Sequence, residues 1–242
     1  MMKLYDDVIK EISALLSPYP CRKIAAAPKC SWKDAGGGSL VLRGDMAYEL
    51  GGSGLPAVGG TLLTTESSLV PEDEILLYGK DLGRIQRDTA YARLAFVRVR
   101  EDCPGEGNAL YEEIRRMEYT RYHVFPEGFM MRISAASERE MVRVSRAALV
   151  RGLNFQAAGE MFLEAFHRNP GTEAVRLIFM TLPDFPYREL EGLVKRSEQI
   201  TKAIDHIFKN LTMDCKACSL KQICDEVEGM KELHFGTGNI RN

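Results

Sequence analysis

The residues best suited to chemistry in this 242-residue chain are three cysteines close together in its last thirty residues. Cys215, Cys218 and Cys224 have the spacing C-x2-C-x5-C. A two-residue gap lets two thiolates point at one metal, and a third cysteine five residues further on can return to the same centre. The spacing therefore predicts a metal site in this segment.

A metal held by three thiolates usually takes a fourth ligand. His234 follows in the same segment and is a candidate for it, and Cys30 and Cys103 are alternatives from elsewhere in the chain. Soft thiolate ligands favour an iron–sulfur cluster, here a [4Fe-4S] cluster. Zinc and unoccupied thiols are the alternatives.

A second candidate site is a group of arginines. A capping box at the start of SEREMVRVSRAALVRG predicts a helix over 137–152. Arg139, Arg143 and Arg146 would then project from one face of it and suit an anionic ligand such as a phosphate. A solvated face, with neighbouring glutamates as partners, is the alternative.

Other patterns assign no chemistry. The glycine-rich run ELGGSGLPAVGG (49–60) lacks the Gly-Lys-Ser/Thr ending of a phosphate-binding loop, and we expect a tight turn there. The four histidines are scattered, and neither G-x-S-x-G nor H-E-x-x-H occurs. The catalytic residues, if there are any, remain unknown.

Composition narrows the class of protein. The net charge of -2 gives no reason to expect a nucleic acid or an anionic membrane as a partner. No apolar run approaches the roughly 18 residues of a membrane span. The N-terminus reads as an amphipathic helix and not as a signal peptide, so we expect a cytoplasmic protein whose six cysteines are reduced or bind metal.

The hydrophobic pattern alternates between helical and strand periods. Helices are expected over 1–16, 109–119, 155–166 and 187–209. Strands are expected at EILLYGKDL (74–82), ARLAFVRVR (92–100), GFMMRIS (128–134) and EAVRLIFMT (173–181). This order predicts an α/β (α+β) fold, a mixed sheet flanked by helices with a C-terminal Cys-containing tail.

The chain divides accordingly into three parts. We expect an N-terminal helix and linker over 1–35, an α/β domain over 36–212 and a Cys-rich segment over 213–242.

Several motifs follow one another in an order that resembles a known family. They are Glu49-Leu50-Gly51-Gly52, ILLYGKDLGRI (75–85), LAFVRV (94–99), ALYEEIRRM (109–117), Met131-Arg132-Ile133-Ser134 and the pair Cys215-x2-Cys218. Together they resemble the middle domain of acetyl-CoA synthase, the β subunit of the carbon monoxide dehydrogenase/acetyl-CoA synthase complex. The resemblance covers roughly residues 45 to 220 as collinear short motifs.

The resemblance implies a ligand and a metal. In the synthases a C-x2-C pair at this position begins the nickel–iron–sulfur cluster, and the same domain contacts coenzyme A. It therefore implies an anionic, coenzyme-A-like ligand near the arginines of the matching segments. These are Arg115, Arg116, Arg132, Arg139 and Arg143.

Departures from the family define the expected role. The 242 residues contain no C-G-C segment of the kind that completes the nickel site, and RYHVFPEGF (121–129) replaces the aromatic stretch that precedes R-I-S in the synthases. We therefore expect an accessory or partial module of anaerobic one-carbon metabolism and not a complete synthase. Activity in the family sense, CO-methylating acetyl-CoA synthesis, would require partner subunits.

Two other functions stay open. In one, the cysteines hold an iron–sulfur cluster in an electron-transfer or binding module that serves a corrinoid or methyltransferase system. In the other, the tail is zinc-stapled or metal-free and the protein is a non-catalytic relic.

Overall fold

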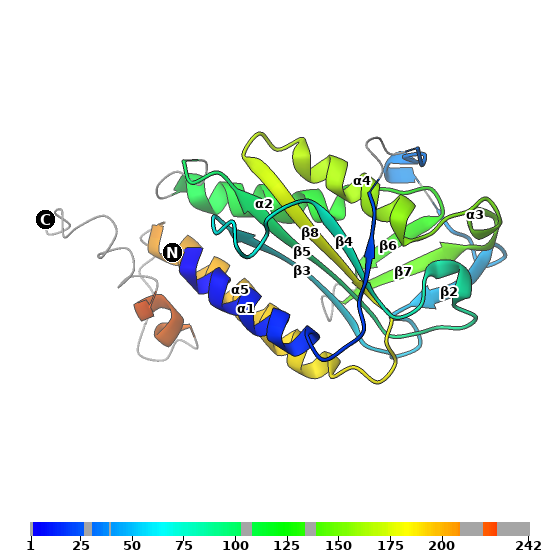
Figure 1. The fold of residues 1–242 in the computed structure, drawn as a ribbon, viewed down its shortest axis with the longest axis horizontal. Coiled ribbons are helices and arrows are strands. Elements are labelled where there is room, and N and C mark those ends of the chain that lie inside the picture. The colour runs from blue at the N-terminus through cyan, green and yellow to red at the C-terminus, as the bar shows by residue number, and fades with distance from the viewer. Residues whose placement is uncertain are drawn as a thin grey trace, which may run out of the picture.

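A five-stranded mixed sheet forms the centre of the molecule (Figure 1). The computed structural model describes residues 2–26, 31–38, 40–102, 108–133, 139–208 and 220–226. In sheet order the strands are β1 (Arg22–Ile24), β4 (Glu74–Tyr78), β8 (Thr172–Met180), β5 (Tyr91–Val99) and β3 (Ala57–Thr64). β4 runs parallel to β8 and β3 parallel to β5, while β1–β4 and β5–β8 are antiparallel pairs.

A second, smaller sheet lies at one end of the first. It consists of three antiparallel strands in the order β2 (Met46–Leu50), β7 (Glu140–Ser145) and β6 (Phe129–Ile133). One face of β7, with Val142 and Val144, is fully buried, and β7 contacts β3 of the large sheet.

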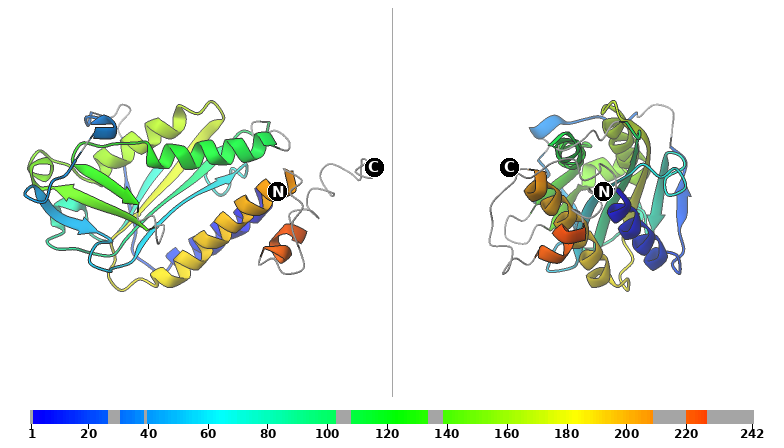
Figure 2. Two further views of the ribbon diagram at one scale, coloured as in Figure 1. Left: turned by 180° about the vertical axis from the view of Figure 1, so that it is seen from behind. Right: turned by 90° about the vertical axis from the view of Figure 1, so that its left-hand side faces the viewer.

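Helices cover both faces of the large sheet, which confirms the predicted α/β architecture (Figures 1 and 2). α1 (Met2–Leu16) and α5 (Tyr187–Phe208) lie together on one face, and α2 (Asn108–Tyr122) and α4 (Phe155–His167) lie on the other. A short helix, α3 (Arg146–Val150), follows β7, and 3-10 turns span Gly36–Gly38 and Leu82–Arg84.

The amphipathic pattern of the N-terminal residues explains how α1 packs. Val8, Ile9 and Ile12 are fully buried, as expected for apolar residues three and four positions apart on a helix. The Tyr5 hydroxyl lies 2.8 Å from the Thr201 hydroxyl, which ties α1 to α5. Within the described residues no helix is both long and apolar enough to cross a membrane.

Most of the predicted helices and strands are present, but the helix predicted over 137–152 is wrong. Residues 140–145 form β7, and Ser145 then caps α3 by accepting a hydrogen bond from the Ala148 amide. The physical reason is the alternation of buried and half-buried residues from Glu140 to Val144, which has the period of a strand. β-branched valines at the buried positions favour that strand.

The glycine-rich run forms the expected tight turn between β2 and β3. Gly51 and Gly54 have φ of +68° and +78°, which glycine adopts without strain. The Asp88 carboxylate fixes the turn, because it accepts hydrogen bonds from the Glu49 amide and the Ser53 hydroxyl.

Candidate anion-binding site

The predicted metal ligands lie almost entirely outside the described residues. Those outside are Cys30, Cys103, Cys215, Cys218 and His234. Cys224 lies in a helical segment, 221–226, and is half-buried against the core together with Ile223. In the described ranges no three His, Cys, Asp or Glu side chains are arranged to hold a metal ion. The metal site therefore stays a prediction.

The five predicted ligand-binding arginines fall into two pairs and one separate residue, Arg139. Arg115 and Arg116 lie on α2, where each forms an ion pair one turn away. Arg115 is 2.6 Å from Glu118, and Arg116 is 2.9 Å from Glu113. Both side chains are more than half exposed, and Arg115 also lines a pocket described below.

Arg132 and Arg143 lie on the half-buried face of the small sheet and share one carboxylate. The Glu49 Oε1 atom is 2.5 Å from Arg132 Nη1 and 3.1 Å from Arg143 Nε. In the part of the chain that the structure describes, each arginine donates only this one side-chain hydrogen bond, although a guanidinium has five N–H donors. We call Glu49, Arg132 and Arg143 the arginine face; it carries a net charge of about +1.

The remaining arginines do not join the arginine face. Arg139 donates hydrogen bonds to the carbonyl oxygens of Gly51 and Leu55 and so holds the turn that precedes β3. Arg146 begins α3 and reaches the Met46 carbonyl at 3.4 Å. The face of three arginines predicted on one helix is therefore not formed.

A second cluster, which the sequence analysis missed, is buried. The Arg93 Nε atom lies 2.7 Å from Glu140 Oε1, and both side chains are 1% exposed. Arg121 Nε lies 3.6 Å from Glu140 Oε2, and Arg93 Nη2 donates to the Arg121 carbonyl oxygen at 2.9 Å. We call Arg93, Arg121 and Glu140 the buried arginine cluster.

Packing explains how the fold accommodates these charges. The Arg93 guanidinium lies over the Phe162 ring at 4.0 Å, and the Arg121 guanidinium lies over the Tyr122 ring at 4.2 Å. Gly59 leaves space for the Glu140 carboxylate, since a Cβ atom there would lie 2.9 Å from the Glu140 Cδ atom.

The buried arginine cluster carries two positive charges and one negative charge. Burial lowers the pKa of Arg121, and Glu140 opposes this shift, followed by the more distant Glu118 and Glu198. Three buried atoms of the cluster have no hydrogen-bond partner among the described residues: Arg93 Nη1, Arg121 Nε and Glu140 Oε2. Such buried polar atoms are uncommon and point to a ligand or a bound water.

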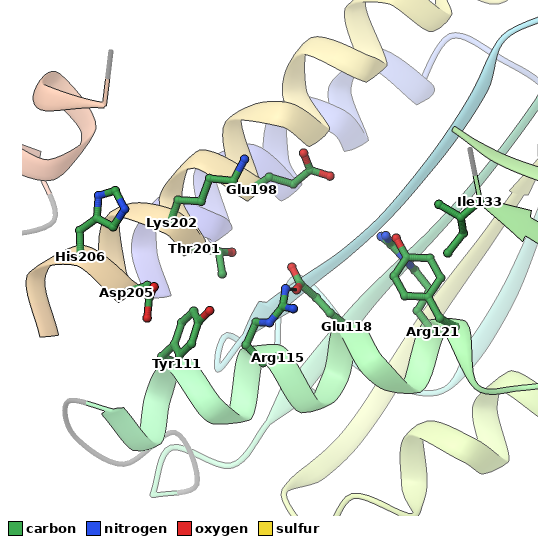
Figure 3. A pocket seen from close by; sticks show the side chains of 11 residues that line it. Tyr111, Arg115, Glu118, Arg121, Ile133, Glu198, Thr201, Lys202, Asp205 and His206 are labelled. Atoms are coloured by element: carbon green, nitrogen blue, oxygen red, sulfur yellow. Dashed lines mark hydrogen bonds and ion pairs between the residues drawn. The ribbon is translucent and has the colours of Figure 1, made fainter. Parts of the chain in front are cut away.

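A pocket of about 400 Å³ lies directly beside this cluster, between α2 and α5 (Figure 3). From α2 it is lined by Tyr111, Arg115, Glu118, Arg121 and Tyr122, from β6 by Ile133, and from α5 by Glu198, Thr201, Lys202, Asp205 and His206. Tyr111 of α2 and Thr201 and Asp205 of α5 point into the space between the two helices. Its volume is in the range of small-molecule sites.

One feature of the sequence does indicate the buried arginine cluster. Arg93 interrupts the apolar run YARLAFV of β5, and a charged residue in a fully buried strand needs a buried partner. Arg121 gave no comparable signal, because an arginine in the last turn of a helix is ordinary. Glu140 was assigned to a helix cap and so hidden by the wrong prediction of secondary structure.

Comparison of the chain with protein-family models gives no match, and comparison with curated proteins gives none either.

Proposed function

We propose that this protein is an accessory module of anaerobic one-carbon metabolism, related to the β subunit of the carbon monoxide dehydrogenase/acetyl-CoA synthase complex, and that it binds a coenzyme-A-like anion. The arginine face is the proposed binding site. The proposal rests on the ordered motifs of the sequence and on how two of them meet in the fold.

One observation carries the proposal. Glu49 of the E-L-G-G motif and Arg132 of the R-I-S motif are 83 positions apart in the chain, yet they form an ion pair of 2.5 Å. Both motifs belong to the resemblance, and β7 lies between their strands in the small sheet. Their contact supports the view that the motifs are parts of one site.

The chemistry of the arginine face suits a phosphorylated ligand. Arginine presents a planar fork of donors that matches phosphate oxygens, and here two guanidinium groups already contact the same carboxylate oxygen. The Arg132 and Arg143 side chains are 35% and 24% exposed, so solvent reaches both. A phosphate could take over the donors that Glu49 does not use.

Calorimetric titration with coenzyme A tests the proposal. We expect coenzyme A to bind the wild-type protein and pantetheine, which lacks the phosphates, not to bind. Arg132→Gln and Arg143→Gln should each weaken binding about tenfold or more, because a hydrogen bond to a charged group contributes about 1.5–3 kcal/mol.

Arg168→Gln is the matched control, since Arg168 is paired with Glu164 at 3.0 Å on the solvent-exposed part of the surface and outside the proposed site. The proposal fails if coenzyme A does not bind, or if the two arginine-face variants bind it as well as the control.

A second candidate function is an iron–sulfur module for electron transfer to a corrinoid or methyltransferase partner. It is supported by the C-x2-C-x5-C spacing and by the packing of Cys224 against the core. About four irons and four sulfides per chain after anaerobic purification, lost in Cys218→Ala, would favour this function. Zinc alone, or no metal, would exclude it.

A further inference from the structure

The pocket between α2 and α5 has a role that the arginine face does not explain. The two sites differ in their residues and in their depth. The arginine face lies on a half-buried strand surface, whereas this pocket reaches the buried arginine cluster through Arg121 (Figure 3). The inference below does not rest on the proposed function.

We infer that the pocket between α2 and α5 binds a small organic monocarboxylate, whose carboxylate pairs with Arg121 and whose apolar body lies against Tyr122 and Ile133.

Arg121 supplies the specific observation. The residue is 7% exposed, it lines the pocket, and its side chain donates no hydrogen bond within the described part of the chain. Its nearest carboxylate, Glu140, is 3.6 Å away and forms its shorter contact with Arg93. A buried guanidinium in this state has donors to offer to an anion that enters the pocket.

The charge balance favours one negative charge on the ligand. Arg93 and Arg121 share the Glu140 carboxylate, and Glu118 and Glu198 also act on Arg121 but form no ion pair with it among the described residues, so a ligand carboxylate would give Arg121 a partner in direct contact. The pocket wall also carries Glu118, Glu198 and Asp205, which would repel a second negative charge on the same ligand. A dianion such as a phosphate monoester fits this wall less well than a monocarboxylate.

The apolar side chains that line the pocket favour a ligand with an apolar body. Tyr122 stacks on the Arg121 guanidinium at 4.2 Å, and the half-exposed Ile133 of β6 lies at the same end of the pocket as Arg121, whereas Tyr111 lies at the other end (Figure 3). Tyrosine and isoleucine side chains gain free energy when an apolar group displaces water from them. Arg115 on α2 and Lys202 on α5 are further cations of the pocket wall.

Titration calorimetry with benzoate and hexanoate tests this inference, with benzamide and hexanamide as neutral analogues of the same size. We expect at least one carboxylate to bind with a dissociation constant of about 1 mM or tighter, as a ligand of this size can reach. The neutral amides should bind at least tenfold more weakly.

A substitution at an exposed residue of the pocket wall tests whether the carboxylate binds in this pocket, and it leaves the core unchanged. Ile133 is 50% exposed, so Ile133→Glu should fold normally and should abolish carboxylate binding by adding a negative charge to the pocket wall. Val150→Glu is the matched control, because Val150 is 86% exposed on α3 and is not among the residues that line the pocket. Arg121→Lys should weaken binding about tenfold, because lysine cannot form the bidentate contact.

Three results would overturn the inference. The first is that neither carboxylate binds at concentrations up to about 20 mM. The second is that the amides bind as tightly as the acids, and the third is that Ile133→Glu binds the carboxylates as tightly as the control variant does. If Arg121→Lys does not fold, the comparison of Ile133→Glu with Val150→Glu still decides.

Discussion

Glu140 holds two arginines in the core, and this single carboxylate connects the two sheets. It comes from β7 of the small sheet, pairs with Arg93 of the large sheet, and fits against Gly59 of β3. Its other neighbour, Arg121, lies on the wall of the pocket between α2 and α5. The residue therefore couples the packing of the fold to the charge of the proposed ligand site.

Replacing Glu140 with glutamine should leave two buried cations without a counter-charge. We expect Glu140→Gln to lower the free energy of unfolding by about 3–5 kcal/mol, as measured by urea denaturation. The control is Glu164→Gln, whose partner Arg168 is exposed, and it should cost no more than about 0.5 kcal/mol. Equal effects of the two substitutions would contradict a structural role for the cluster.

Packing between elements depends on close approaches at glycine. Gly159 of α4 lies against β4, where an added Cβ atom would be 2.7 Å from the Ile75 Cδ1 atom. Gly192 of α5 faces open space, and an added Cβ atom would meet no atom within 4 Å. The two helical glycines therefore have different physical roles.

This difference predicts that alanine substitutions at the two positions change the stability of the protein in opposite directions. Gly159→Ala should destabilise the protein by about 1–3 kcal/mol through overpacking of α4 against β4. Gly192→Ala should stabilise it by about 0.5–1 kcal/mol, because alanine loses less entropy in a helix than glycine does. Thermal unfolding of both variants measures the effects, and a stabilised Gly159→Ala would show that α4 does not pack as described.

Asp6 gives the contact between α1 and β3 a dependence on pH. It is 9% exposed, and the Thr64 hydroxyl donates to its Oδ1 atom at 2.6 Å. Burial raises the pKa of Asp6 above its ordinary value of 3.8, and the hydrogen bond from Thr64 only partly opposes this shift. The folded state therefore binds the proton of Asp6 more tightly than the unfolded state does.

It follows that ionised Asp6 lowers stability at neutral pH and that protonation removes this cost. Asp6→Asn should have a higher free energy of unfolding than the wild type at pH 7, and the gap should close as the pH falls to 3.8 and below. Denaturation at several pH values measures it. Asp7→Asn, on the exposed side of α1, is the control, and a gap that stays constant with pH would contradict the prediction.

Across the whole molecule, the sequence predicted the elements whose hydrophobic period was unambiguous. Their apolar residues recur with the period of a helix or of a strand, but not of both. These elements are α1, α4, α5, β5 and β8. Residues of β7 were predicted as a helix because the capping-box pattern is a local signal. Whether they form a strand depends on pairing with β2 and β6, which flank β7 in the small sheet.

The site was predicted in part for a related reason. Arg132 and Arg143 were identified as ligand-binding residues, but their meeting at Glu49 depends on the pairing of three strands that are distant in sequence. The buried arginine cluster joins β5, α2 and β7, and no single segment contains a sign of that contact. Long-range pairing of this kind is fixed by the fold and not by local pattern.

If a coenzyme-A-like anion binds across the arginine face, amide hydrogen exchange measured with and without coenzyme A should locate it. We expect slower exchange in β2, β6 and β7, the three strands that carry Glu49, Arg132 and Arg143. Unchanged exchange in all three strands at saturating coenzyme A, or protection confined to α2 and α5, would contradict binding at the arginine face.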